Sequence, residues 1–548
     1  MAKITGGRLA VKVLKNEGVE CIFALPGLHV DPIFQGCMDE KVRVIDVRHE
    51  QTTAMMAEGW ARVTGQPGIA VATAGPGVTN AITGLWNSFE CLAPTILFGG
   101  RSPLSEFELG SLQDMDSLSL VDSVTKWRRG GYEAKRIPEY VSMAYRQALA
   151  GRPGPVYLEF PYDVLVAEVE ENEVSFPAGY RTAVRPQGDT ALIRKAVDLL
   201  LDADRPVVIA GSGIWWSRAE KELQEFIELL KIPLTLIQMA RGAVSEDHPL
   251  CFGPTRVGTR EADVVLLIGT RLNYGLNFGR PGLFGEKGKW IQIDIEPGEI
   301  GRNRSIDIGI TGDAKAVLSQ MVEEARDRCK GRQELPWVEE CREYVKKRQP
   351  QLEDAMNSDS VPIHPARLCK EIRDFIDRDA TIVMDGGDCT RWGAAVIKGY
   401  EPGHWLDNGP TGCLGVGIPF AMAAKVARPD KQVILLQGDG SFGLNAMEFD
   451  TMVRHNIPVV CVICNDESWG MIVRAQQTLG EDRIIGSILG SRPYHKMVEG
   501  LGGYGEYVEK PEEIRSALER AFTSGKPACV NVKCVRIARE SRRRPSTA

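Results

Sequence analysis

The chain has 548 residues, several times the length of a typical domain, so more than one domain is expected. Apolar residues make up 43% of it and charged residues 25%, which excludes a largely disordered chain. The formal net charge is −7 and no basic block precedes the last residues, which argues against a nucleic-acid partner. No segment reaches the ~18 consecutive apolar residues of a membrane helix. With 13 scattered cysteines, these features predict a soluble, cytoplasmic protein without a membrane partner.

Three series of apolar strands alternate with helical segments along the chain. Strands such as GIAVATAGPG, ADVVLLIG and KQVILLQGDG each end in glycine and lead into a helix, which is the rhythm of a parallel sheet. Two polar, proline-containing stretches, near 170–190 and 331–362, are interpreted as linkers. The predicted fold class is α/β, with three doubly wound parallel-sheet domains at residues 1–170, 190–335 and 360–535, and a basic tail at 536–548.

The strongest local signal lies in the third series. A strand runs into Gly438-Asp439-Gly440-Ser441, and the next strand ends at a second polar cluster containing Asp466 and Ser468. Because neighbouring parallel strands end at the same edge of a sheet, the two clusters can converge. Oxygen donors suit Mg²⁺, and glycines let backbone N–H groups approach a diphosphate. A Gly-Asp-Gly sequence alone often makes only a turn, but the spacing of the two strand ends favours a metal–diphosphate site.

The first series places a carboxylate in an unusual setting. Glu50 directly follows a strand and begins a helix rich in alanine and methionine. A glutamate there commonly complements the helix dipole. In an apolar pocket, it could instead exchange protons with a heterocyclic nitrogen. Its position in the sequence leaves both interpretations open.

These segments together resemble the thiamine-diphosphate-dependent enzymes. VRHEQTTAMMAEGWAR and TAGPGVTNAITGL resemble their pyrimidine-binding domain, and GDGSFGLNAMEFDTMVRHNIPVVCVICND resembles their diphosphate-binding motif. The resemblance covers essentially the whole chain, in the order pyrimidine-binding, central and diphosphate-binding domain. Within the family, ITGG, PGLHVDPIF and SLQDMD are most similar to benzaldehyde lyase. Acetolactate synthases and the 2-hydroxyacyl-CoA lyase and oxalyl-CoA decarboxylase group share the architecture.

The resemblance implies roles for the residues that match the family motifs. Glu50 would bond the aminopyrimidine N1′ and help to activate the thiazolium carbon, while the turn at Gly412 would bind the 4′-amino group. Leu414 would be the apolar wedge that bends the cofactor. Asp439, Asp466 and the backbone of Ser468 would coordinate Mg²⁺. The family normally has Asn at the position of Asp466, so this chain places one more negative charge beside the diphosphate.

Further residues follow from the same comparison. His29 and Gln113 would face the reacting carbon as catalytic residues, although a histidine at a glycine-rich turn can also be a surface residue. The other implied cofactor-binding residues are Gly387, Asp388, Gly438, Gly440, Ser441, Trp469, Gly470 and Met471. Met471 stands where benzaldehyde lyase has a smaller residue, which favours a narrower substrate pocket. Leu112 replaces the phenylalanine that acetolactate synthases have before their glutamine.

The resemblance implies a C–C bond lyase or carboligase that uses thiamine diphosphate and Mg²⁺ on 2-hydroxy ketones and aldehydes. The alternative activities are those of an acetolactate-synthase-like enzyme acting on a 2-keto acid and of a lyase acting on an acyl-CoA. A non-enzymatic cofactor-binding protein would lack the catalytic carboxylate, so Glu50 argues against it. The family also implies a homodimer or homotetramer, with the cofactor between the first domain of one subunit and the third of another. Because lyase chemistry moves no net electrons, we expect a colourless protein without FAD.

Overall fold

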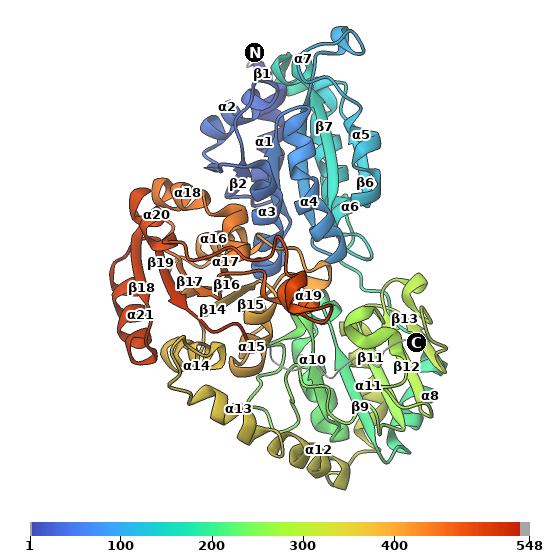
Figure 1. The fold of residues 1–548 in the computed structure, drawn as a ribbon. Helices are drawn as coiled ribbons and strands as arrows, with labels where there is room; N and C mark the ends of the chain where they lie inside the picture. The colour runs from blue at the N-terminus through green and yellow to red at the C-terminus, as the bar shows by residue number, and fades with distance from the viewer. Residues whose placement is uncertain (1–2, 538–548) are drawn as a thin grey trace. The chain divides into compact units, whose positions relative to one another are not determined.

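Parallel sheets organise the computed structural model, which describes residues 3–537 (Figure 1). In that range, the strand orders of the three large sheets are β3-β2-β4-β5-β7-β6, β10-β9-β11-β12-β13 and β15-β14-β16-β17-β19-β18. Every neighbouring pair in them is parallel, and among the strand pairs of residues 3–537 only the short β1–β8 pair is antiparallel. The predicted fold class is therefore confirmed.

The first sheet and its helices come from the N-terminal third of the chain. Its strands alternate with helices because short runs, mostly apolar and mostly closed by glycine or proline, are followed by helical segments. The strands of this sheet are β2 (Cys21–Ala24), β3 (Arg43–Asp46), β4 (Gly68–Ala72), β5 (Thr95–Arg101), β6 (Trp127–Gly130) and β7 (Val156–Pro161), while β1 (Lys3–Thr5) and β8 (Glu168–Glu170) form a separate pair. The helices are α1 (Gly6–Asn16), α2 (Asp31–Glu40), α3 (Glu50–Thr64), α4 (Pro76–Glu90), α5 (Ser117–Leu120), α6 (Ile137–Leu149) and α7 (Tyr162–Val166).

The central sheet follows a stretch without regular structure at 174–189. Its strands are β9 (Pro206–Ala210), β10 (Leu234–Leu236), β11 (Val264–Ile268), β12 (Lys289–Asp294) and β13 (Ile308–Thr311). Its helices are α8 (Thr190–Leu201), α9 (Gly213–Ser217), α10 (Glu220–Leu230) and α11 (Ala314–Arg326). The charged stretch after it is not the linker that we expected, because α12 (Pro336–Lys346) and α13 (Gln349–Met356) lie there. Trp337 and Cys341 of α12 are buried and pack against the central sheet, which gives this charged segment an apolar face.

The third sheet carries the glycine-rich turns. Its strands are β14 (Thr381–Asp385), β15 (Trp405–Leu406), β16 (Val433–Gly438), β17 (Val460–Asn465), β18 (Tyr504–Val508) and β19 (Ala528–Lys533). The helices of this part are α14 (Pro365–Phe375), α15 (Asp388–Val396), α16 (Gly417–Ala427), α17 (Asp439–Asn445), α18 (Glu448–His455), α19 (Gly470–Gln477), α20 (Tyr494–Gly500) and α21 (Ile514–Thr523). Within the described residues, no helix is both long and apolar enough to cross a membrane.

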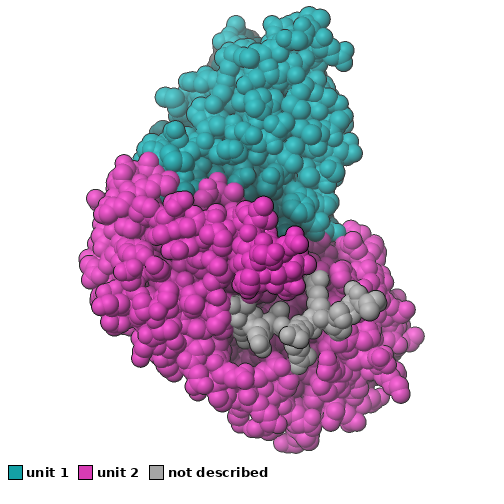
Figure 2. Space-filling view, viewed as in Figure 1, with its two compact units in different colours: residues 1–183, 409–429, 445–457 teal, residues 184–408, 430–444, 458–548 magenta. Residues whose placement is uncertain are grey.

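The chain divides into two compact units (Figure 2). The first comprises residues 1–183, 409–429 and 445–457, and the other described residues form the second. Helices α16 and α18 therefore belong to the first unit, although they come from the last third of the sequence. Gly59 of α3 lets α16 pack closely, because a Cβ there would lie 3.0 Å from the Cβ of Ala423. The Arg62 guanidinium lies over the Phe420 ring of α16, 4.9 Å from its centroid.

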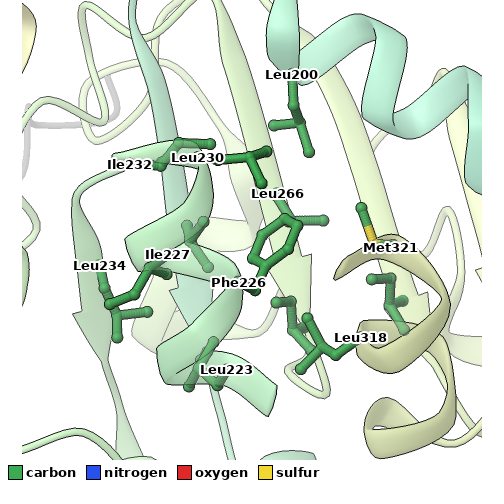
Figure 3. Packing of buried hydrophobic residues seen from close by; sticks show 14 of the residues in the cluster. Leu200, Leu223, Phe226, Ile227, Leu230, Ile232, Leu234, Leu266, Leu318 and Met321 are labelled. Carbon is green, nitrogen blue, oxygen red and sulfur yellow. The ribbon is translucent and has the colours of Figure 1, made fainter. Parts of the chain in front are cut away.

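Both faces of the central sheet are buried at β9 and β11, and these two strands are apolar throughout. Val208 and Leu266 point into one cluster of buried residues, whereas their neighbours Val207 and Leu267 point into another. This alternation is the period-two geometry of a strand between two layers. Figure 3 shows the first cluster, in which the Phe226 ring of α10 lies among leucine side chains and beside β11.

Replacing Phe226 with alanine should destabilise this domain. Phe226 is 0% exposed, and deletion of a buried aromatic ring typically costs about 3–5 kcal/mol because it leaves a cavity. We expect a lower midpoint of thermal unfolding by calorimetry. Lys221→Ala on the exposed face of the same helix is the control, with little expected change. An unchanged midpoint for Phe226→Ala would show that this core tolerates the cavity.

Candidate functional site

The first sheet reverses its strand order between β2 and β4, where parallel α/β sheets commonly bind ligands. His29 follows β2, is 3% exposed, and its Nδ1 lies 3.2 Å from the Thr73 hydroxyl that follows β4. Burial lowers the pKa of His29, and a hydrogen bond with the Leu112 backbone opposes part of this shift. The imidazole is therefore held neutral at neutral pH, in a form that can accept a proton. Thr73 was not singled out from the sequence.

Gln113 lies on the same edge of the first sheet. Its φ angle is 60°, and the turn at Gly75 approaches it so closely that a Cβ there would lie 2.9 Å from the Gln113 Cβ. Because His29 bonds the backbone of the adjacent Leu112, the structure brings the His29 and Gln113 segments together. The Leu112 side chain is 63% exposed. The geometry is compatible with the predicted pairing, and the catalytic roles of both residues stay predictions.

Glu50 is the first residue of α3 and is 8% exposed. The Asn80 amide of α4 donates a hydrogen bond of 2.9 Å to its Oε2. This bond orients the carboxylate. Asn80 lies within the TAGPGVTNAITGL segment, so the motif contained it, although no feature of the sequence indicated this contact.

Helix α18 holds the turn that precedes Glu50. Both carboxylate oxygens of Glu448 accept the Arg48 backbone N–H, at 3.0 and 3.1 Å, and the Thr451 hydroxyl donates to the same carboxylate at 2.6 Å. At the end of β3, the His455 ring lies 2.7 Å from an Asp46 carboxylate oxygen. A helix distant in sequence thus sets where α3 begins, which local sequence patterns do not reveal.

In the first unit, a network of hydrogen-bonded polar side chains holds the Gly412 turn. The Thr411 hydroxyl donates to the Asn87 side-chain oxygen and accepts the Cys413 backbone N–H at 3.1 Å. The Asn87 amide in turn donates to both oxygens of Glu58, at 3.0 and 2.8 Å. Gly412 has φ 63°, a left-handed conformation that favours glycine. This network fixes the turn to which the resemblance assigns the aminopyrimidine.

One asparagine joins this turn to the start of α3. The Asn445 amide donates to the Gly415 carbonyl at 2.6 Å, and its Oδ1 accepts the Gln51 amide at 3.2 Å. Gly415 follows Leu414, which is half-buried, and Gln51 follows Glu50. The segments of Glu50 and Leu414 are therefore held by the same side chain.

The second set of predicted residues follows β14, β16 and β17, which are adjacent and parallel. In this register Asp385 pairs with Gln437, and Gly438 pairs with Cys464. The turns that follow these strands therefore meet at one edge, beside the reversal of strand order between β14 and β16. The structure brings together the predicted residues Gly387, Asp388, Gly438, Asp439, Gly440, Ser441, Asp466, Ser468, Trp469, Gly470 and Met471.

The glycines of these turns are needed because side chains of α19 and its preceding loop pack directly on them. A Cβ at Gly440 would lie 2.6 Å from the Trp469 ring, and one at Gly387 would lie 2.3 Å from the Met471 sulfur. A Cβ at Gly470 would lie 2.5 Å from an Asp466 carboxylate oxygen. The first contact places Trp469 against the first turn of α17, and the second places Met471 against the turn that precedes α15.

Two acidic side chains at this edge are suited to a cation. Asp439 is 2% exposed, and within residues 3–537 its Oδ2 has no hydrogen-bond partner. Burial, together with the neighbouring Asp466, raises the pKa of Asp439 to about 7. The Ser468 backbone N–H and hydroxyl donate to Asp466 Oδ1, at 3.1 and 3.0 Å. A buried carboxylate oxygen without a donor, beside a second carboxylate, fits a divalent cation.

The donor set is compatible with Mg²⁺, and binding of this ion stays a prediction. In the described part of the chain, no three His, Cys, Asp or Glu side chains gather as a metal site. Mg²⁺ commonly takes only one or two carboxylates and completes its shell with phosphate oxygens and water. Asp439 and Asp466 meet that requirement, while coordination by the Ser468 carbonyl stays a prediction.

Two arginines accompany the acids of this edge. Arg474 of α19 forms a two-bond ion pair with Asp388, with Nη2 2.7 Å from Oδ1. Arg474 thereby balances the negative charge of the Asp388 carboxylate. This charge balance permits the diphosphate contact that the resemblance implies for Asp388. Arg536 donates to the Ser468 hydroxyl at 2.7 Å and to the Asp466 carbonyl at 3.2 Å. The sequence predicts Arg536 only as part of the basic tail, whose residues 538–548 lie outside the described part.

Comparison with known proteins gives a consistent result over the whole chain. Three family models match: the N-terminal TPP binding domain of thiamine pyrophosphate enzymes at 4–120, their central domain at 193–321, and their C-terminal TPP binding domain at 385–532. The chain is 38% identical to an acetolactate synthase large subunit of Mycobacterium tuberculosis over 96% of this chain and 95% of the relative. It is 32% identical to a 2-hydroxyacyl-CoA lyase of Arabidopsis thaliana, over 96% and 95%.

Proposed function

Because the chain belongs to the thiamine pyrophosphate enzyme family, and within it to the acetolactate synthase and 2-hydroxyacyl-CoA lyase group, we propose that it makes or breaks the C–C bond beside a carbonyl of a small 2-hydroxy ketone or 2-keto acid. It is a thiamine-diphosphate-dependent enzyme, and Mg²⁺ is its proposed metal. The observation that carries the proposal is the buried Glu50 carboxylate, held by Asn80 at the start of α3.

The protein residues have limited but specific tasks in this chemistry. When bound, thiamine diphosphate supplies the electron sink for the C–C bond, so few protein acids and bases are needed. Glu50 would hold or release a proton at the pyrimidine ring. His29, neutral and fixed against Thr73, would accept the proton of the substrate hydroxyl, with Gln113 beside it as a hydrogen-bonding group. Asp439 and Asp466 would hold Mg²⁺ and, through it, the diphosphate.

The preference for a small substrate rests on Met471. Its sulfur occupies the space over Gly387, and its side chain is 37% exposed at the start of α19. A long, exposed side chain beside the diphosphate turn narrows the space for a substituent on the substrate. Neither relative named above is a benzaldehyde lyase, so the aromatic specificity suggested by the sequence resemblance is the weaker alternative, and acetoin or pyruvate is the preferred substrate.

Three substrates separate the enzymatic alternatives. Purified protein with thiamine diphosphate and Mg²⁺ is incubated with acetoin or benzoin, with pyruvate, and with a 2-hydroxyacyl-CoA, and the products are quantified. Turnover of acetoin or pyruvate supports the proposal. Preferred cleavage of benzoin, or turnover confined to the acyl-CoA, would overturn the proposed substrate class. The absorbance spectrum of the same preparation tests for FAD, and a stoichiometric flavin would favour acetolactate synthase.

Replacement of His29 by alanine should affect catalysis and leave cofactor binding intact. General acid–base groups typically contribute about 10²–10⁴-fold, and we expect kcat to fall by about 10²-fold. The thiamine diphosphate affinity should stay close to wild type, because His29 contacts Thr73 and the Leu112 backbone, not the residues assigned to the cofactor. Steady-state kinetics and calorimetric titration measure the two quantities.

The control for this variant is His248→Ala, because His248 pairs with Glu228 in the central domain and has no part in the proposed reaction. Equal losses in both variants would show a general effect on folding. Wild-type kcat in His29→Ala would exclude His29 from the reaction. The homodimer or homotetramer and the cytoplasmic location stay predictions, of which light scattering tests the first.

A further inference from the structure

Asp466 has two acidic neighbours where the turns of the third sheet converge, Asp388 and Asp439. A Cβ at Gly470 would lie 2.5 Å from an oxygen of Asp466 and 3.2 Å from an oxygen of Asp388, and Asp439 is the third acid of this edge. A bound diphosphate would add more negative charge than one Mg²⁺ neutralises. Such a cluster requires further positive charge or a reduced number of ionised acids.

The structure supplies two guanidinium groups to this cluster. Arg474 neutralises Asp388 through the two-bond ion pair. Arg536 approaches from the segment after β19 and contacts the loop that carries Asp466, at 2.7 Å to the Ser468 hydroxyl and 3.2 Å to the Asp466 carbonyl. Each arginine is thus associated with one acid, and Arg536 serves the acid that the family usually replaces with asparagine.

The contacts of Arg536 also impose a direction on the hydrogen bonds. A guanidinium can only donate, so the Ser468 oxygen accepts from Arg536 Nε. The Ser468 hydroxyl proton is then available for Asp466 Oδ1, which lies 3.0 Å away and also accepts the Ser468 backbone N–H at 3.1 Å. Both bonds require Asp466 to be an acceptor on Oδ1, and its other oxygen faces the space beside Gly470. The relay Arg536–Ser468–Asp466 therefore orients the Asp466 carboxyl group, with Oδ1 as the acceptor.

We propose that Arg536 is a positioning residue of the Mg²⁺–diphosphate site, which fixes Asp466 through Ser468 and compensates the charge that an aspartate adds at this position. The inference rests on the proposed function, because the site it serves is the one proposed for Mg²⁺ and the diphosphate. The proposal predicts that the effect of Arg536 on cofactor affinity depends on the negative charge of Asp466.

A double-mutant cycle tests this dependence in the full-length chain. The four proteins are the wild type, Arg536→Gln, Asp466→Asn and the double variant, and the measured quantity is the dissociation constant of thiamine diphosphate at saturating Mg²⁺, by calorimetric titration. Mutation of an outer-shell partner of a metal ligand typically changes affinity by about 10–100-fold. Because the Arg536 side chain is solvent-exposed, we expect binding at the lower end of this range, about tenfold weaker, for Arg536→Gln. In the Asp466→Asn background, the same substitution should weaken binding by less than about threefold.

Two further variants separate charge from hydrogen bonding. Arg536→Lys keeps the charge without the planar fork, and should retain part of the affinity. Ser468→Ala removes the relay and should also weaken binding, and in that background Arg536→Gln should have a smaller effect. Arg515→Gln on α21 is the matched control, since Arg515 forms an exposed ion pair with Glu519 on the same helix.

Each result has a clear meaning. If Arg536→Gln weakens thiamine diphosphate binding equally in the wild-type and Asp466→Asn backgrounds, Arg536 has a merely structural role. If it does not weaken binding in the wild-type background, Arg536 is not part of the site. Either result overturns the inference. If the wild type itself binds thiamine diphosphate without needing Mg²⁺, the proposed metal site fails, independently of Arg536. A loss that depends on Asp466 supports the proposal.

Discussion

Substitution of Glu50 by glutamine is expected to lower kcat by about 10²–10⁴-fold, the range of a general acid–base group. Glutamine keeps the size of the side chain and can keep the 2.9 Å bond with Asn80 by rotation of its amide. It cannot exchange a proton with the pyrimidine ring. The loss should therefore appear in kcat, while the melting temperature stays near that of the wild type.

Binding and turnover must be measured separately for this variant. Calorimetric titration gives the affinity for thiamine diphosphate, and the kinetic assay uses saturating cofactor. Glu133→Gln, at an exposed position of the same unit, is the control and should behave as wild type. Full turnover by Glu50→Gln at unchanged cofactor affinity would contradict the proposed mechanism.

Substitution of Asp439 by asparagine is expected to change binding and stability in different directions. A partner of a metal ligand is typically worth about 10–100-fold in metal affinity, so loss of a ligand should weaken Mg²⁺-dependent binding by at least about 100-fold. In the protein without metal, Asp439 is a buried carboxylate beside Asp466, and its Oδ2 lacks a donor among the described residues. Removal of one of two like charges should leave the melting temperature unchanged or raise it.

Thermal unfolding with and without Mg²⁺ and thiamine diphosphate measures both effects in one series. The wild type should gain stability on addition of the two ligands together, because they bind only the folded state. Asp439→Asn should gain little. A variant that loses stability without ligands, yet gains as much as the wild type with them, would show that Asp439 is structural and does not bind the metal.

Local patterns in the sequence predicted the three sheets and the approach of the turns that carry the acidic residues. Glycine-closed apolar strands followed by helices predicted three α/β sheets, because parallel strands covered on both faces are continuously apolar. The Asp439 and Asp466 turns were predicted to meet, because adjacent parallel strands end at one edge, and the register of β16 and β17 agrees with this. The stretch 331–362 was wrongly interpreted as a linker, because charged residues on one face of α12 concealed the buried Trp337 and Cys341.

The sequence by itself determined the fold class, the family and the residues that could carry the chemistry, since each depends on short segments whose meaning is local. Only the tertiary structure decided what surrounds those residues. Glu448 holds the turn before Glu50, Asn445 joins α3 to the Gly412 turn, and Arg536 bonds Ser468. These partners lie about 400, 30 and 70 residues away in the chain. Hydrogen bonds and ion pairs act over a few ångströms, so they depend on how distant segments pack, which no local pattern records.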